Sequence, residues 1–223
     1  MPGCAAPIGI TVRPMFAEDV DSVAQIESDG HAPCLVEGAH VLRSHLELYP
    51  AGCWVAELIP EGDGRRDAEH APRTGLTVHG YLIACPWRTA DAPMPLHATT
   101  NGSMPADADT FYVHDLCVLR RSTRLGIGSA LLKRATQAAR RLGLHTSTLV
   151  AVGGSEHWWA SKGYQRVPQS SVARSSVERL REYSGSGEAG SAVLMQLVLL
   201  EESGDTQAAR ECLDAPCRVF KYI

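Results

Sequence analysis

Apolar residues recur with two different spacings along the chain, and these spacings predict alternating strands and helices. Helical spacing predicts helices at residues 18–26, 37–48, 127–142 and 177–183, with a shorter one at 157–162. Alternation or a short apolar run predicts strands at residues 10–13, 53–57, 75–85, 111–119, 149–152 and 192–199. No internal repeat is visible. This order of elements favours one mixed α/β domain.

Polar segments rich in glycine and proline separate these elements. Residues 59–74 are charged and punctuated by glycine, which predicts a hairpin loop, and residues 184–191 predict a flexible joint. Residues 89–109 carry three prolines and little periodicity. A loop of that length inside a compact domain is often functional.

The strand at residues 111–119 carries the most reactive side chains. Strict alternation places Phe111, Val113, Asp115 and Cys117 on one face and Tyr112, His114, Leu116 and Val118 on the other. His114 has two interpretations, a structural histidine or a base, since imidazole accepts a proton near neutral pH. Asp115 shares the face of His114 only if a bulge interrupts the strand. It either orients a substrate or caps a local backbone group.

The charges are unevenly distributed along the chain. A formal charge of −4, from 21 basic and 25 acidic residues, excludes the generally basic balance of a nucleic-acid-binding protein. Residues 116–155 nevertheless contain no Asp or Glu and hold seven of the basic residues, namely Arg120, Arg121, Arg124, Lys133, Arg134, Arg140 and Arg141. The rest of the chain is strongly acidic.

Gly126 and Gly128 begin a predicted helix inside this basic block. Backbone amides at a helix N-terminus bind anions when no side chain obstructs them. The segment lacks both the Gly-Lys-Ser/Thr ending of a Walker loop and the G-x-G-x-x-G spacing. Two interpretations remain at this point: an anion site, or a plain turn with a solvated basic face.

Cysteines and histidines form no local pattern of metal ligands. The seven cysteines are scattered, and the close pair Cys212 and Cys217 has no second pair or nearby histidine, so reduced thiols are expected. His40 and His45 lie five residues apart, on different helix faces. We therefore expect no metal.

Targeting signals are also missing from the sequence. The start of the chain lacks a signal peptide, and the longest apolar run, Val193–Leu200, is too short to span a bilayer. The expected location is the cytoplasm, with no membrane partner.

The glycine turn resembles motif A of the GNAT superfamily of N-acetyltransferases, Gln/Arg-x-x-Gly-x-Gly/Ala. Residues 123–128 (Thr-Arg-Leu-Gly-Ile-Gly) match except at Thr123, and Arg124 is a candidate for the missing charge. Residues 150–164, with the pair Trp158-Trp159 and a Gly-Tyr ending, resemble motif B. The His-Asp-Leu strand, residues 49–54 and Glu182-Tyr183 resemble the serotonin (arylalkylamine) N-acetyltransferase branch.

The resemblance implies a single GNAT-like α/β domain over residues 9–200, followed by a C-terminal extension at 201–223. Its mixed central sheet of about six to seven strands is flanked by helices and splayed at the fourth and fifth strands. The implied function is acetyl-CoA-dependent N-acetyl transfer, directly to a primary amine in a ternary complex.

The resemblance also assigns site residues. His114 takes the place of a catalytic histidine, and Asp115 is grouped with it as catalytic. Acetyl-CoA, the co-substrate, is assigned to Leu116, Cys117, Val118, Arg124, Leu125, Gly126, Ile127, Gly128, Ser129, Ala130 and Trp159. Cys117 is expected to be a small buried residue, because direct transfer needs no acyl-enzyme.

One departure from the family leaves a second function open. Trp159 stands where serotonin acetyltransferases have the tyrosine that protonates CoA, and indole cannot replace that acid, while Tyr164 is expected to pack in the core. Together with Thr123, this motivates an alternative, an acyl-CoA-binding module with little or no turnover. Nucleic-acid recognition by the basic helix lacks the interleaved aromatic residues it needs.

The acceptor, a small-molecule or peptide amine, is expected to be enclosed by loops at residues 27–36, 48–53 and 86–109. These loops mix His31, Cys34, Pro50, Trp87 and His97 without a clear charge preference. Glu27, Asp29 and Glu37 could attract a cationic amine, or simply be solvated. A monomer and a homodimer are both compatible with the sequence.

Overall fold

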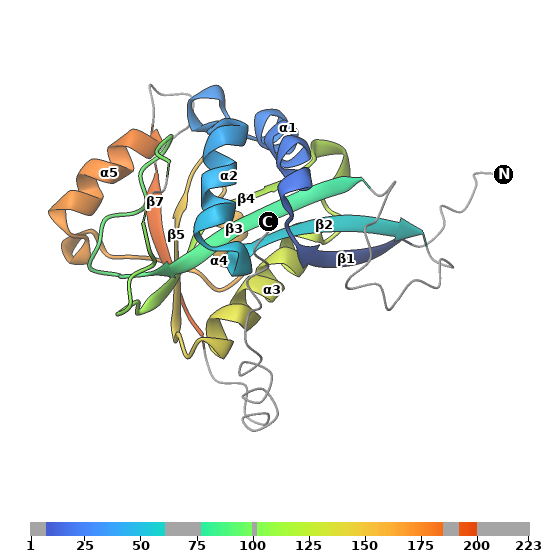
Figure 1. Ribbon diagram of the computed structural model, residues 1–223. Helices are drawn as coiled ribbons and strands as arrows, with labels where there is room; N and C mark the ends of the chain where they lie inside the picture. The colour runs from blue at the N-terminus through green and yellow to red at the C-terminus, as the bar shows by residue number, and fades with distance from the viewer. Residues whose placement is uncertain (1–7, 61–76, 100–101, 185–191, 200–223) are drawn as a thin grey trace, which may run out of the picture.

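The computed structural model describes residues 8–60, 77–99, 102–184 and 192–199 and contains a seven-stranded sheet (Figure 1). The strands are β1 (Ile8–Pro14), β2 (Cys53–Pro60), β3 (Val78–Trp87), β4 (Thr110–Val118), β5 (Thr146–Ala151), β6 (Gln165–Arg166) and β7 (Val193–Val198). Their order is β1-β2-β3-β4-β5-β7-β6. Neighbours are antiparallel except the parallel pair β4 and β5. The predicted single α/β domain with a mixed sheet is confirmed.

Five α-helices flank this sheet: α1 (Val20–Gly30), α2 (Gly38–Leu48), α3 (Ile127–Arg141), α4 (Glu156–Ser161) and α5 (Arg174–Ser184). Short 3-10 turns lie at Ala17–Asp19, Pro33–Leu35, Pro50–Gly52, Arg120–Ser122 and Gln169–Ser171. The sequence pattern anticipated all five α-helices, to within a few residues at their ends. It missed the two-residue strand β6, which is too short to show a periodic pattern.

Helices α1 and α2 cover one face of the sheet and α3 covers the other (Figure 1). Strand β2 shows how the sequence specifies both layers, because its side chains alternate between them. Trp54 and Ala56 join the α3 side, whereas Cys53 and Val55 pack with α1 and α2. A strand that is apolar at consecutive positions is therefore buried on both faces.

Strands β4 and β5 are paired at only one end. Their parallel pairing covers three positions, from Phe111 opposite Ser147 to Val113 opposite Leu149. From His114 onward, the described part of β4 has no pair on β5, so its backbone is free on that side. The predicted splay between the fourth and fifth strands is present, and it opens the sheet beside the most reactive strand.

A bulge in β4 changes which side chains share a face. The register against β3 shifts between Ile83, opposite Asp115, and Ala84, opposite Val113, so His114 is the extra residue. Cys117 consequently packs with α1 and α2, whereas Leu116 and Val118 pack against the α3 side with Phe111 and Val113. The strict alternation expected for this strand is therefore wrong beyond Val113, and the bulge is the physical reason.

Several predicted segments lie outside the described residues. These are most of the hairpin loop at 59–74, all but Ser184 of the joint predicted at 184–191, the pair Cys212 and Cys217, and the extension at 201–223; Ser184 is the last residue of α5. Among the helices that are described, none combines the length and apolarity of a membrane span.

Candidate active site

A single cavity of about 810 Å³ runs through the opening between β4 and β5. At one end it is lined by the turn and first residues of α3, and along its middle by β4, the end of β5 and the two tryptophans of α4. The other end is lined by His31, Ala32, Leu35, Glu37, Leu96 and Tyr183. Two of the three predicted acceptor loops, residues 27–36 and 86–109, thus contribute to this end.

Most of the predicted site residues line this cavity. They are His114, Asp115, Leu116, Cys117, Val118, Arg124, Gly126, Ile127, Gly128, Ser129 and Trp159. Leu125 and Ala130 are not among the lining residues, and Leu125 is 45% exposed. The structure thus brings together the strand and the glycine turn that the sequence singled out.

The N-terminus of α3 is open toward the cavity because of its glycines. Gly126 precedes the helix in the left-handed region, at a φ of 89°, where a side chain is strained. Ala130 donates the first helical hydrogen bond, to the carbonyl of Gly126 at 3.0 Å, so the amides of residues 127–129 precede the helical ladder. A Cβ on Gly128 would lie 3.0 Å from the ring of Trp158. Close packing therefore explains this glycine.

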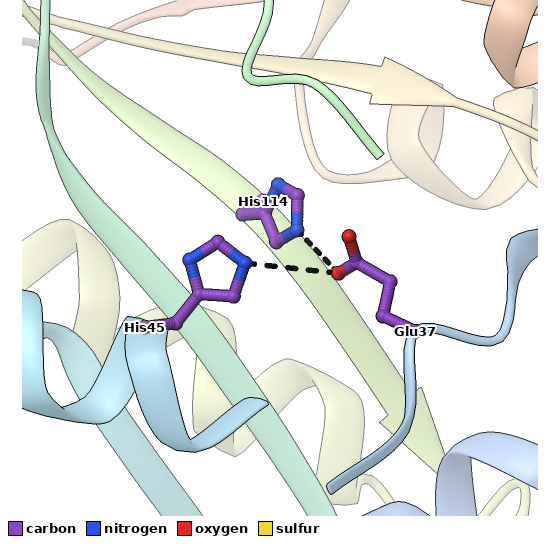
Figure 2. A group of neighbouring side chains, drawn as sticks. All are labelled: Glu37, His45 and His114. Atoms are coloured by element: carbon purple, nitrogen blue, oxygen red, sulfur yellow. Dashed lines mark hydrogen bonds and ion pairs between the residues drawn. The ribbon is translucent and has the colours of Figure 1, made fainter. Parts of the chain in front are cut away.

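His114 is buried and pairs with Glu37, at the start of α2 (Figure 2). The distance from His114 Nε2 to Glu37 Oε2 is 2.7 Å, and His114 Nδ1 has no hydrogen-bond partner among the described residues. Burial lowers the pKa of His114, but the charge and hydrogen bond of Glu37 outweigh it and raise the pKa overall. Burial alone would raise the pKa of Glu37, but His114 and His45 have the larger effect and lower it overall. The carboxylate of Glu37 is therefore ionised.

Glu37 is held in place by the side chain of Glu27 and by the backbone amide of His97. The carboxylate of Glu27, fully buried in α1, accepts hydrogen bonds from the backbone amides of Glu37 and Gly38 at 2.8 and 2.9 Å. These hydrogen bonds anchor the start of α2. The amide of His97 donates to Glu37 Oε1 at 2.8 Å. From the sequence, these glutamates could only be expected to attract a cationic amine or to be solvated. Their pairing with buried partners depends on the packing of α1 against α2.

Asp115 forms a second buried cluster beside the first. Its Oδ1 is 2.8 Å from His31 Nε2, and its Oδ2 accepts a hydrogen bond from the Tyr81 hydroxyl. The charge of Asp115 raises the pKa of His31 to about 9. Burial raises the pKa of Asp115, but His31 and Tyr81 outweigh this and lower it. Asp115 thus binds the side chain of the residue that follows α1 and a side chain of β3, and among the described residues it caps no backbone group.

The aromatic residues behind the cavity divide into packing and lining groups. Trp159 is 7% exposed, contacts Trp158 and Tyr164 edge to face, and also lines the cavity. Tyr164 is buried, with its hydroxyl 2.7 Å from Ser147 Oγ, in agreement with the core position expected of it. Tyr183 of α5 lines the cavity, and its hydroxyl donates to the carbonyl of Met94 at 2.6 Å.

Cys117 is buried next to the site, 3.5 Å from the carbonyl of Ile26. Burial raises its pKa to about 12, so the sulfur is a thiol at neutral pH. Cys34, Cys53 and Cys85 are also free thiols in the described part of the chain.

This sheet, opened between a bulged fourth strand and a parallel fifth and facing a glycine-led helix, has the GNAT-like α/β fold. Residues 78–163, from β3 through α4, match the model of the acetyltransferase (GNAT) family. A search of curated proteins gives no match.

Solved structures share the fold over most of the chain. Ard1 from Thermoplasma volcanium has a TM-score of 0.56 at 15% identity, over 86% of this chain and 99% of that one. A GNAT-like decarboxylase, GphF, in complex with isobutyryl-CoA has a TM-score of 0.57 at 17% identity, over 85% and 100%. The ribosomal-protein-S18-alanine N-acetyltransferase from Escherichia coli has a TM-score of 0.54 at 13% identity, over 89% and 100%.

At these identities the structural matches show the fold alone. The family model and the shared fold together support a GNAT-superfamily acetyltransferase domain. The arylalkylamine branch stays a prediction.

Proposed function

We propose that this protein transfers an acetyl group from acetyl-CoA directly to a primary amine in a ternary complex. The observation that carries the proposal is the continuity of the cavity. One space connects the N-terminus of α3, the unpaired edge of β4 and the pair of His114 with Glu37. This reaction needs three parts in one space: an end that binds phosphate, an extended middle for the pantetheine arm, and an end with a general base.

The cofactor half of the proposal rests on backbone groups. Amides of residues 127–129 and the side chain of Arg124 face the space assigned to the pyrophosphate of acetyl-CoA. The edge of β4 at residues 116–118, left without a pair on β5, offers hydrogen bonds to the pantetheine arm and the thioester. Thr123 departs from the family pattern, but backbone donors do not depend on that side chain.

The proposed base is His114, oriented by Glu37. The carboxylate of Glu37 accepts a hydrogen bond from the N–H at Nε2 of His114, so the proton of the neutral ring is on Nε2. The lone pair is then on Nδ1, which has no hydrogen-bond partner among the described residues. This is the arrangement by which a carboxylate selects the tautomer of a catalytic histidine. In the reaction the amine nitrogen bonds to the acyl carbon, its proton passes to His114 Nδ1, and the C–S bond breaks.

We assign the proton for the departing CoA thiolate to Tyr183. Trp159 has no acidic proton to give, whereas Tyr183 lines the cavity and carries a phenolic proton. In this structure that proton is donated to the carbonyl of Met94, so the proposed step requires the hydroxyl to turn from Met94 to the thiolate, and the hydroxyl of Tyr112, 3.2 Å away, can then donate to Tyr183. Burial raises the pKa of Tyr183, so the phenol carries its proton at neutral pH. In the sequence, Tyr183 stands out only as part of the family resemblance.

The first test measures CoA thiol release with arylalkylamines, polyamines, amino sugars and peptide N-termini. We expect release above background hydrolysis with at least one class, and a fall in kcat of about 100-fold or more in His114→Gln, because general base catalysis typically contributes that much. Acetyl-CoA affinity should not change, and His145→Gln, at an exposed histidine, is the matched control.

Tight acetyl-CoA binding without release for any amine would instead favour the binding module, the second candidate function. The observation in its favour is the buried Trp159 in the place of the family's acid.

A second test addresses Tyr183. Tyr183→Phe keeps the packing of the ring but removes the proton, so we expect kcat to fall by at least about 10-fold with little change in the Kd of acetyl-CoA. Tyr164→Phe, which removes a buried hydroxyl that bonds Ser147, is the control for a purely structural loss. Equal effects of both variants on stability and on kcat would contradict the role of Tyr183.

A further inference from the structure

We propose that Glu37, His45 and His114 form a binding site for one transition-metal dication of the Zn²⁺ type at the acceptor end of the cavity. Each residue offers one ligand atom, and the three atoms lie within 4.8 Å of one another. The residues come from the start of α2, from its last turn and from β4 (Figure 2). No spacing along the sequence could reveal this group, because the fold alone brings β4 next to α2.

The distances fit the coordination of a metal by two imidazoles and one carboxylate. Glu37 Oε2 lies 2.7 Å from His114 Nε2 and 3.7 Å from His45 Nε2. Four-coordinate Zn²⁺ binds such ligands at about 2.0–2.2 Å, which places the ligand atoms about 3.3 Å from one another. Small side-chain rotations therefore convert the present arrangement into a metal site.

His45 supplies the second observation that points to a ligand. Its side chain is 2% exposed, and its Nε2 has no hydrogen-bond partner among the described residues. The 3.7 Å separation from Glu37 Oε2 is within the distance of an ion pair, drawn in Figure 2, but it is too long for a hydrogen bond. A buried nitrogen without a hydrogen-bond partner destabilises the folded protein. A cation bound to His45 Nε2 would supply the missing partner.

The surroundings of the group also suit a metal. Glu37 Oε1 already accepts the amide of His97, which would fix the carboxylate while Oε2 binds the ion. Glu37 and His114 line the cavity, so an ion has an entry path and an open fourth position. Two imidazoles and one carboxylate favour Zn²⁺ or a neighbouring transition metal over Mg²⁺ and Ca²⁺, which prefer oxygen ligands.

The consequence for activity rests on the proposed function. A metal on His114 Nε2 takes the lone pair of that nitrogen, so the single proton of the neutral imidazole, which Nε2 shares with Glu37 when no metal is bound, moves to Nδ1. With Nδ1 protonated, His114 can no longer accept a proton from the amine. Zn²⁺ is therefore an inhibitor of the acetyl transfer, and a chelator restores activity.

The test uses the full chain, stripped of metal with a chelator and desalted, and Zn²⁺ alone as the probe. Competition with a chromophoric chelator measures affinity and stoichiometry without any turnover, and Co²⁺ reports the geometry of the site by its visible absorption. We expect one ion per chain and a Kd at least about 100-fold weaker in His45→Gln, since even residues outside the ligand set change affinity by about 10–100-fold.

The matched control is His40→Asn, on the exposed side of the same helix, which should keep the wild-type Kd. Glu37→Gln is the second variant, so the proposal remains testable if His45→Gln does not fold. Substoichiometric Zn²⁺ binding by the wild-type chain, or equal Kd values in wild type, His45→Gln and Glu37→Gln, would overturn it.

The two proposals fail separately. If no amine is acetylated, stoichiometric Zn²⁺ binding that depends on His45 still supports the metal site. If turnover is found but the stripped protein binds no Zn²⁺, the metal site is wrong and the transferase stands.

Discussion

At the scale of single residues, the neighbouring residues His114 and Asp115 of β4 each form an ion pair inside the cavity. His114 pairs with Glu37 and Asp115 pairs with His31, so four titratable side chains lie at one end of the cavity. The bulge at His114 makes this possible, since regular alternation would place the two side chains on opposite faces. Sequence analysis identified both residues but not their partners.

The pair of His31 and Asp115 predicts a pH-dependent stability. The folded-state pKa of His31 is about 9, above its usual value near 6.5 in an unfolded chain. The contribution of this pair to the free energy of unfolding is therefore fully present below about pH 6.5 and is lost as the pH rises through about 9. We expect the Tm to fall by several degrees between pH 6 and pH 9.5, as measured by circular dichroism.

His31→Gln should be less stable at pH 6 and should show a flatter dependence of Tm on pH over the same range. A wild-type Tm that is constant or rises between pH 6 and pH 9.5, or an equally steep fall in His31→Gln, would contradict this assignment.

At the scale of elements, α3 and the strand before it form the part of the molecule that the sequence described best. The apolar stripe of the helix, the glycine turn and the basic residues are all local patterns, and the helix begins and ends close to the predicted residues. Left-handed glycines lie at both ends, Gly126 at a φ of 89° and Gly143 at 72°. Only Gly126 faces the cavity.

The two glycines give a matched pair of variants. Gly126→Ala and Gly143→Ala should each cost about 1–2 kcal/mol of unfolding free energy, because alanine is strained in the left-handed region. Only Gly126→Ala should weaken the binding of acetyl-CoA, measured by calorimetry. Equal acetyl-CoA affinities in the two variants would argue against the N-terminus of α3 as the pyrophosphate site.

At the scale of the whole molecule, buried ionic contacts connect the first segments of the chain. Arg13 of β1 bonds both Asp19, before α1, and Glu57 of β2, at distances of 2.7–2.9 Å. The side chains of Asp19 and Glu57 are only 8% and 1% exposed. Removal of Arg13 would therefore take away the cation that bonds two buried carboxylates at once.

We expect Arg13→Met to lower the unfolding free energy by about 3–5 kcal/mol, as measured by urea denaturation. Arg179→Met is the matched control, because it breaks the more exposed pair with Glu182 and should cost less than about 1 kcal/mol. Similar losses in the two variants would show that burial does not set the value of the Arg13 contacts.

Basic and acidic residues that are unevenly distributed along the chain meet at one cavity in the folded molecule. Arg124 of the basic block lines the cavity beside the N-terminus of α3, which forms one end, and Glu37 and Asp115 line the cavity at the acceptor end. The sequence predicted the first end from a run without acidic residues. It could not predict that the two carboxylates are paired with histidines, because those histidines come from distant segments.

The sequence by itself determined the order of strands and helices, the glycine turn and the position of His114, because each depends on residues close together in the chain. Tertiary structure alone decided the bulge that places Asp115 beside His114, the contact of Tyr183 with the cavity, and the meeting of Glu37, His45 and His114. These features depend on how α2, β4 and α5 pack together, and packing joins residues that no local pattern connects.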